Sequence, residues 1–195
     1  GNLRQAAEVA ANLLKGHAAA YHAIHEVQMD AQVGIVRQIR PFQPSRPDSL
    51  LDRWAARNLD LAFNTRFNQA LITGRLLWPL GAGRVKGLAN SFDFFGLNYY
   101  TRERVAFSLR HAGQFFARRH YTPEAELSDN NYGEIYPAGI TDAIRTAAAY
   151  RRPIYITENG LPDADDDQRP RFILGHLRQI WGAIQFNLPI MGYYH

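Results

Sequence analysis

Short apolar stretches rich in β-branched and aromatic residues alternate with longer amphipathic stretches along all 195 residues. Their periods predict helices over residues 3–29, 48–72, 137–150 and 170–187, and strands over residues 34–36, 92–100, 154–157 and 190–194. An alternation of this kind favours βαβ units and therefore an α/β fold around a parallel sheet. In such folds the carboxyl ends of the strands share one edge, and ligands bind at that edge.

Proline and glycine mark the ends of several of these elements. Pro41 and Pro44 interrupt the chain after the first strand, and Gly74 ends the second helix. Residues 103–133 predict a long excursion before the next helix, of a length that is uncommon unless the segment is functional or is ordered by the rest of a protein. No linker divides the sequence, so we expect a single domain over residues 1–195.

The composition is that of an ordinary globular protein. Hydrophobic residues make up 46% of the chain, which is an average share, and no apolar run approaches the length of a membrane span. The chain has no cysteine, which excludes disulfide bonds and thiolate metal sites within it. We therefore expect no membrane partner. We also expect a cytoplasmic location, since a reducing compartment is compatible with this composition.

The net charge of +4 comes almost entirely from arginine, because Lys15 and Lys86 are the only lysines among 22 basic residues. One region combines arginines with aromatic side chains that a nucleic-acid-binding protein would use for stacking: Arg102, Arg104, Phe107, Arg110, Phe115, Phe116, Arg118, Arg119 and Tyr121. Acidic residues interrupt this set, and it forms no continuous basic stripe. A solvated loop and helix face is therefore the favoured interpretation, and we expect no nucleic-acid partner.

One carboxylate stands at the end of a predicted buried strand. In the sequence Tyr-Ile-Thr-Glu-Asn-Gly at residues 155–160, Glu158 closes an apolar run and is followed at once by a turn signal, Asn159 and Gly160. A charged side chain in this place points beyond the edge of the sheet. A Glu that caps the next loop, or that simply reaches water, would give the same pattern. The residues alone leave these interpretations open.

A second predicted strand ends in two polar side chains. Asn98 and Tyr100 are two residues apart, so a strand presents both on one face and toward the same edge. A buried Asn and Tyr that bond to backbone groups would also fit. Trp78 and Tyr132 are further candidates for the wall of a ligand pocket, because their rings can stack on a flat ligand, although packing is the more common role of such residues.

Two groups of residues have the chemistry of metal ligands without the required spacing. The acidic run of residues 163–167 lacks the Gly turn and the closing Glu of a calcium loop, so a solvated loop is favoured. His17, His22 and His25 lie on one predicted helix without a spaced partner, and helical surface histidines are the expected interpretation. The sequence therefore predicts no metal site.

Residues 155–160 resemble the nucleophile motif of glycoside hydrolase family 1, the β-glucosidase family. Further segments resemble blocks of the same family in the same order: Ala-Asn-Leu-Leu-Lys-Gly-His-Ala at 11–18, Asp-Phe-Phe-Gly-Leu-Asn-Tyr-Tyr-Thr at 93–101, Glu-Ile-Tyr-Pro-Ala-Gly-Ile at 134–140, and Pro-Ile-Met-Gly-Tyr-Tyr-His at 189–195. The resemblance covers essentially the whole chain. It implies a partial (β/α)₈ TIM barrel, roughly strands 5 to 8 with their helices.

The resemblance also implies a retaining β-glycosidase, with β-glucosidase as the first expectation, and no cofactor. Glu158 matches the catalytic nucleophile of the family, Tyr100 matches the tyrosine that donates to and orients it, and Asn98 matches a polar residue of the sugar subsite. The expected partner is a β-linked glucoside or a related saccharide.

The family carries its acid/base Glu in an Asn-Glu-Pro motif, which does not occur in these 195 residues. We therefore expect a single partial barrel domain, truncated at both ends, that is inactive alone and self-associates through open barrel edges. The alternative is a non-catalytic carbohydrate-binding remnant, or a half-barrel that needs a partner chain. Asn68 departs from the family pattern, which usually has an apolar residue at that helix position.

Overall fold

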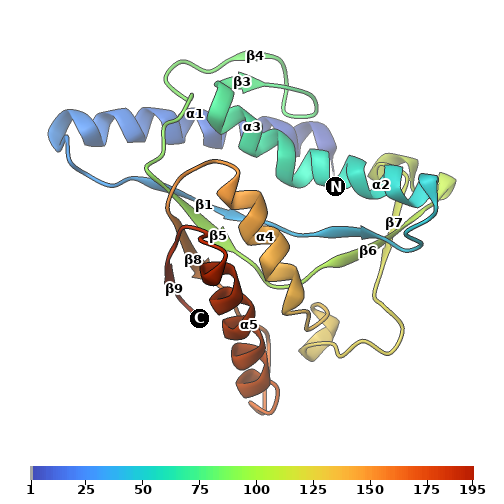
Figure 1. Ribbon diagram of the computed structural model, residues 1–195. Coiled ribbons are helices and arrows are strands. Elements are labelled where there is room, and N and C mark those ends of the chain that lie inside the picture. The colour runs from blue at the N-terminus through green and yellow to red at the C-terminus, as the bar shows by residue number, and fades with distance from the viewer. Residues whose placement is uncertain (1) are drawn as a thin grey trace. The chain divides into compact units, whose positions relative to one another are not determined.

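Four strands that lie far apart in the sequence form the main sheet of the computed structural model, which describes residues 2–195 (Figure 1). Their order in the sheet is β1 (Gly34–Gln38), β5 (Phe94–Asn98), β8 (Ile154–Glu158) and β9 (Ile190–Tyr193). β8 and β9 pair in parallel. Each of the four matches a strand that the sequence predicts, and helices separate them along the chain. The predicted α/β class with a parallel sheet is therefore confirmed.

The chain divides into two compact units, one made of Gly1–Ile35 and Leu61–Phe95, the other of Val36–Asp60 and Gly96–His195. The first unit contains α1 (Leu3–Val27), α3 (Arg66–Thr73) and the antiparallel pair of β3 (Arg75–Leu76) and β4 (Gly83–Arg84). Within it, α1 packs against α3 and buries Leu14 and Ala18.

The second unit places two helices beside the last two strands of the main sheet. α4 (Ala138–Ala148) and α5 (Arg169–Gln185) pack against each other, and α4 contacts β8 (Figure 1). Ile154 and Ile156 of β8 are completely buried. This apolar layer fixes β8 up to its carboxyl end. Over residues 2–195, none of the helices combines the length and the apolar character that crossing a membrane requires.

A second, three-stranded sheet occupies much of the region for which the sequence predicts an irregular excursion. β2 (Phe42–Pro44) pairs in parallel with β6 (Glu103–Phe107), which pairs antiparallel with β7 (Ala117–His120). The expectation of an irregular excursion is wrong for β6 and β7, because these strands are short and rich in charged residues, so no apolar run marks them. Pro44 is tolerated because β2 is an edge strand of this sheet.

The core of this second sheet is small, and helix α2 (Leu50–Asp60) covers it. Ala55 and Ala56 of the helix are buried in one cluster with Val105 and Ala117 of the sheet. Small side chains at the contact allow the helix to approach the strands closely.

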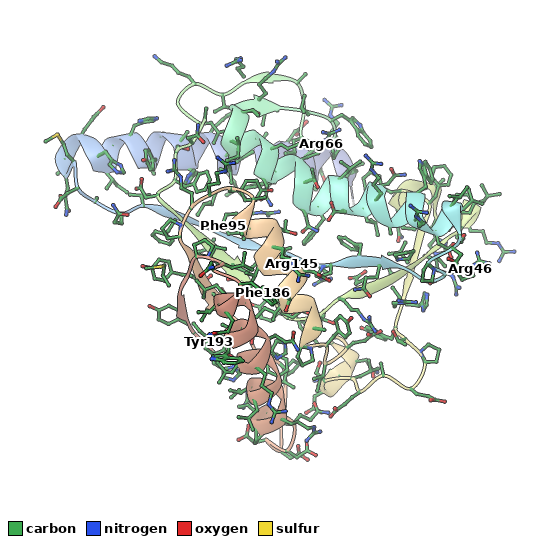
Figure 2. All side chains as sticks on the ribbon, in the orientation of Figure 1. Arg46, Arg66, Phe95, Arg145, Phe186 and Tyr193 are labelled. Atoms are coloured by element: carbon green, nitrogen blue, oxygen red, sulfur yellow. The ribbon has the colours of Figure 1, made fainter. Side chains whose placement is uncertain are left out.

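A buried carboxylate ties α2 to the sheet beside it. The Asp52 side chain is completely buried, and it accepts hydrogen bonds from Nε of Arg46 (2.9 Å; labelled in Figure 2) and from the Phe107 N–H (2.9 Å). The bond from Arg46 is the main cause that lowers the pKa of Asp52, from 3.8 to about 2. Because the folded pKa lies below the ordinary value, this stabilisation is complete above pH 4 and disappears as the pH falls toward 2.

We therefore expect Asp52→Asn to lower the free energy of unfolding at pH 7 by about 2 kcal/mol, since an amide cannot accept the same charge-assisted bonds. The variant is also expected to lose less stability than the wild type between pH 4 and pH 2. Urea unfolding over this pH range measures both effects. Equal pH dependence in the two proteins would contradict the role given to Asp52.

The helix predicted over residues 48–72 is interrupted. α2 ends at Asp60, Leu61–Thr65 form a π-helical turn, and α3 follows. A π turn continues the helical hydrogen bonding with one extra residue, so the apolar period alone does not reveal it. The predicted end of this helical stretch is confirmed, because Gly74 caps α3 with a φ of 68°.

Asn68 on α3 is a buried polar residue whose side-chain amide makes no hydrogen bond within residues 2–195. Its side chain is 1% exposed, and neither Oδ1 nor Nδ2 has a hydrogen-bond partner among the described residues. Leaving a buried amide unsatisfied costs about 1–3 kcal/mol. We expect Asn68→Leu to raise the free energy of unfolding by about 1 kcal/mol or more, measured by urea unfolding. Asn12→Leu, at an exposed position of α1, is the control. A less stable Asn68→Leu protein would show that the amide is satisfied.

Candidate active site

Glu158 is the last residue of β8 and is exposed at the carboxyl end of the main sheet. The hydroxyl of Tyr100 donates a hydrogen bond to its Oε2. Tyr100 follows β5, the neighbouring strand, by two residues. The fold therefore brings together the two side chains that the resemblance assigns to the nucleophile and to the group that orients it.

Tyr99 explains why Tyr100 faces the carboxylate. The Tyr99 N–H donates to the Glu158 carbonyl (3.0 Å), which extends the pairing of the two strands. Its ring is completely buried, and its hydroxyl donates to the Tyr136 carbonyl (2.6 Å). Burial raises the pKa of Tyr99, so its phenol stays protonated as a donor. Successive side chains of an extended chain point to opposite faces, and Tyr100 is therefore directed to the other side.

Asn98, the last residue of β5, lies two residues before Tyr100 and faces the same side of the strand. Its side chain is 8% exposed, and its Oδ1 accepts a hydrogen bond from the Thr157 hydroxyl (2.6 Å). Gly96 lies two residues before Asn98. Neighbouring strands leave no room for a side chain at Gly96, because a Cβ there would lie 2.8 Å from Cγ2 of Val36 and 3.2 Å from Oγ1 of Thr157. Asn98 and Tyr100 thus contact successive residues of β8, Thr157 and Glu158.

The sequence pattern missed the role of Asn159, which it interprets as a turn residue. The side chain is 1% exposed. Its Nδ2 donates to the Tyr99 carbonyl (2.8 Å), and its Oδ1 accepts from the hydroxyl of Tyr193 (3.1 Å), which is labelled in Figure 2. Burial raises the pKa of Tyr193, so this hydroxyl also remains a donor. Asn159 therefore holds three neighbouring strand ends in place around Glu158, a role that only the spatial order of the strands reveals.

A second group that the sequence did not predict supports the segment after β5. Glu134 is buried and accepts hydrogen bonds from the Thr122 N–H and from Nε of Arg102 (2.8 Å). Burial opposes its ionisation, but these donors outweigh that effect and lower the pKa of Glu134. The Arg102 guanidinium also lies 3.6 Å from the centre of the Tyr136 ring. The paired charges of Glu134 and Arg102 thus anchor the segment that follows β5.

One of the aromatic residues considered from the sequence lies beside the candidate site. The Tyr132 ring stands edge-on to Tyr100, with 6.1 Å between the ring centres and 89° between the planes. Tyr132 is 49% exposed, so part of its side chain is open to solvent. Trp78 is exposed in the first unit, beside Leu3 and Pro79 in a separate cavity.

The acidic run of residues 163–167 includes a carboxylate that bonds to backbone groups nearby in the sequence. Oδ2 of Asp163 accepts from the backbone N–H groups of Gln168 (3.0 Å) and Arg169 (2.8 Å), which makes it a cap for the start of α5. The carboxylates of Asp163, Asp165 and Asp167 come within 4.8 Å of one another, and those of Asp165 and Asp167 are exposed.

The sequence predicts that the histidines of α1 are helical surface groups. In the structure each of them also contacts a residue outside the helix. His17 bonds to the Ser91 carbonyl (2.6 Å) and His22 to the Gly87 carbonyl (2.8 Å). His25 pairs with Asp93 at 3.4 Å. These contacts hold α1 to residues 87–93 within the first unit.

Comparison with known proteins agrees with the resemblance seen in the sequence. The chain is 30% identical over 192 residues to a beta-galactosidase of Sulfolobus acidocaldarius, an alignment that covers 94% of this chain and 38% of that protein. It is 27% identical over 214 residues to a 1,4-beta-D-glucan glucohydrolase of Thermotoga neapolitana, covering 94% of this chain and 47% of that protein. The chain thus spans less than half the length of these relatives.

Solved structures show the same relationship in the fold. A beta-glycosidase from Pyrococcus horikoshii superposes with a TM-score of 0.84 at 36% identity, covering 95% of this chain and 42% of that one. A family 1 glycoside hydrolase from Thermotoga maritima superposes with a TM-score of 0.86 at 25% identity, covering 98% and 47%. The sequence model of glycosyl hydrolase family 1 matches residues 1–195. The chain therefore belongs to glycosyl hydrolase family 1.

Proposed function

We propose that this chain supplies the nucleophile side of the active site of a retaining β-glycosidase. The observation that carries the proposal is the hydrogen bond from the Tyr100 hydroxyl to Glu158 at the carboxyl end of β8. In this proposal β1, β5, β8 and β9 are the fifth to eighth strands of a (β/α)₈ barrel. Glu158 then closes the seventh strand at the face of the barrel where enzymes of this architecture hold their active sites.

Glu158 attacks the anomeric carbon of a β-linked sugar and forms a covalent glycosyl ester as the bond to the leaving oxygen breaks. Water then cleaves the ester, and the configuration is retained. A second carboxylic acid, about 5 to 5.5 Å from the nucleophile in enzymes of this type, protonates the leaving oxygen and later activates the water. The Asn-Glu-Pro motif that bears this acid does not occur in the 195 residues, so another part of the complete protein supplies it.

Tyr100 and Asn98 position the reacting groups. The Tyr100 hydroxyl engages Oε2 of Glu158, which fixes the carboxylate and leaves Oε1 for attack. Oδ1 of Asn98 already accepts a hydrogen bond from Thr157, so its Nδ2 is the group left to donate to a sugar hydroxyl.

The substrate in this proposal is a β-linked glucoside or galactoside. The relatives named above are a beta-galactosidase and a glucan glucohydrolase. The Thermotoga maritima enzyme has been solved with a cyclophellitol analogue described as a transition state mimic and, separately, with castanospermine. These names support binding of a saccharide.

Trapping the glycosyl ester tests the assignment. A 2-deoxy-2-fluoro-β-glucoside with a good leaving group is incubated with the complete protein, because the fluorine slows hydrolysis of the ester and lets it accumulate. After peptic digestion, mass spectrometry is expected to find the added sugar on the peptide that contains Glu158. The peptide that contains Glu134 serves as the internal comparison. A label on any other carboxylate would contradict the proposal.

A further inference from the structure

A cavity of about 400 Å³ lies next to the tyrosine that contacts Glu158. It belongs entirely to the larger unit, and its lining includes Arg40, Glu103, His111, Arg119, His120 and Tyr132. The cavity therefore shares one aromatic residue with the surroundings of Tyr100, since the Tyr132 ring stands edge-on to Tyr100. Its volume lies within the range of small-molecule sites.

Two arginines of the cavity contact the same carboxylate. Nη1 of Arg40 lies 2.5 Å from Oε1 of Glu103, and Nη1 of Arg119 lies 3.3 Å from the same oxygen. The other oxygen of Glu103, Oε2, is buried.

Arg119 is the cation placed to meet a ligand. Its side chain is 53% exposed, whereas the side chains of Arg40 and Glu103 are 22% and 12% exposed. The 3.3 Å bond to Glu103 is the longer of the two contacts and involves only Nη1. A guanidinium presents several donors in one plane, which suits it to pair with a second carboxylate while it keeps the first.

Aromatic side chains also line the cavity. His120 is fixed by its two ring nitrogens, which bond to the Ser45 hydroxyl and to the Tyr121 carbonyl. His111 bonds to the Ser108 hydroxyl (2.9 Å). The ring of Tyr132 is half-exposed and stands edge-on to Tyr100. A flat ring that packs on Tyr132 can carry a polar substituent toward Arg119 in the same cavity.

We propose that this cavity accepts the leaving group of the substrate and favours aromatic leaving groups that carry a carboxylate, with Arg119 as the residue that selects for the charge. This inference rests on the proposed function, because it places the sugar at Glu158 and the leaving group beyond Tyr100. Arg119 acts on recognition and takes no part in the bond-breaking step.

Binding of isolated leaving groups tests the cavity without any turnover. The probes are 4-hydroxybenzoate and 4-hydroxybenzamide, which have nearly the same shape and differ in charge at neutral pH. Titration calorimetry on the complete protein is expected to give about five- to tenfold tighter binding of the carboxylate. Higher salt is expected to reduce this preference, since part of the cavity is open to solvent.

Two adjacent arginines of β7 make a matched pair of variants. Arg119→Gln is expected to bring the affinity ratio of the two probes close to one. Arg118→Gln removes the same charge from a neighbouring exposed position outside the cavity lining, and is expected to keep the preference. Equal affinities in the wild type, no binding of either probe, or an equal effect of both variants would overturn the inference.

A kinetic experiment separates this inference from the proposed function. The complete protein is assayed with 4-carboxyphenyl and 4-carbamoylphenyl β-D-glucosides. The ratio of their kcat/KM values is compared between wild type and Arg119→Gln, because the two phenols differ slightly as leaving groups. An unchanged ratio with both compounds hydrolysed overturns the role of Arg119 alone. If neither compound is hydrolysed, the proposed function fails, and the binding experiment still decides the cavity.

Discussion

Replacement of Glu158 by alanine is expected to lower kcat of the complete enzyme by roughly 10⁴-fold or more, because no other group can form the covalent bond to the sugar. The space left by the carboxylate lies at the open edge of the sheet, where Glu158 is exposed. A small anion such as azide or formate can enter it and attack in place of the carboxylate. With an activated β-glucoside, azide is therefore expected to restore part of the rate and to give the α-glycosyl azide.

The anomeric configuration of the rescue product decides the assignment. An anion that replaces the nucleophile attacks from the same side and inverts the centre once. A β-configured product, or a variant that stays active without added anion, would show that Glu158 is not the nucleophile. Glu126→Ala is the matched control, because Glu126 makes an exposed ion pair with Arg171 and such pairs contribute little to stability.

The 195-residue chain alone is expected to hydrolyse an aryl β-glucoside at least about 10²- to 10⁴-fold more slowly than the complete protein, which is the usual contribution of general acid catalysis. The reason is chemical: the sequence contains the proposed nucleophile but no Asn-Glu-Pro motif. A continuous assay of the purified chain measures the rate. Glu158→Ala in the same chain is the control for contaminating glycosidase, and a rate close to that of the complete protein that disappears in this control would contradict the prediction.

The state of the isolated chain must be measured in the same experiment. β1 and β9 are the edge strands of the main sheet, and α5 exposes Leu174, Trp181 and Ile184. Unpaired strand edges and exposed apolar stripes favour association. We expect light scattering to show self-association of the chain, and a monodisperse monomer would contradict this expectation.

The sequence alone located the elements whose signals are local. The strands of the main sheet are continuous apolar runs, and the helices repeat apolar residues at three to four positions, so both were predicted. The signals failed where an element depends on its neighbours. β6 and β7 are short and charged, and they become strands because α2 covers them and buries Val105 and Ala117. The π turn at Leu61–Thr65 leaves no mark in the apolar period.

The candidate site likewise combines features that local sequence signals predict with features that depend on neighbouring strands. Motif and spacing singled out Glu158, Tyr100 and Asn98, since each stands at or just beyond a strand end, and their catalytic roles stay predictions. Only the tertiary structure decided that the Tyr100 hydroxyl contacts Glu158 and that Asn159 bridges Tyr99 and Tyr193. These contacts depend on which strands are neighbours in the sheet, and that order follows from burial and pairing over the whole chain.

The cavity beside Tyr100 is the feature that the sequence predicts least, because distant segments of the chain form it. Its lining comes from residue 40 and from residues 103–132, and the charge pattern of the second segment predicts only a solvated face for its arginines. What the sequence determined is the class of fold and the chemistry available at the strand ends, because periodicity and motif are local properties. What only the tertiary structure decided is which charges meet, because Arg40 and Arg119 come to share Glu103 through the pairing of β6 with β7 and the folding of distant segments against each other.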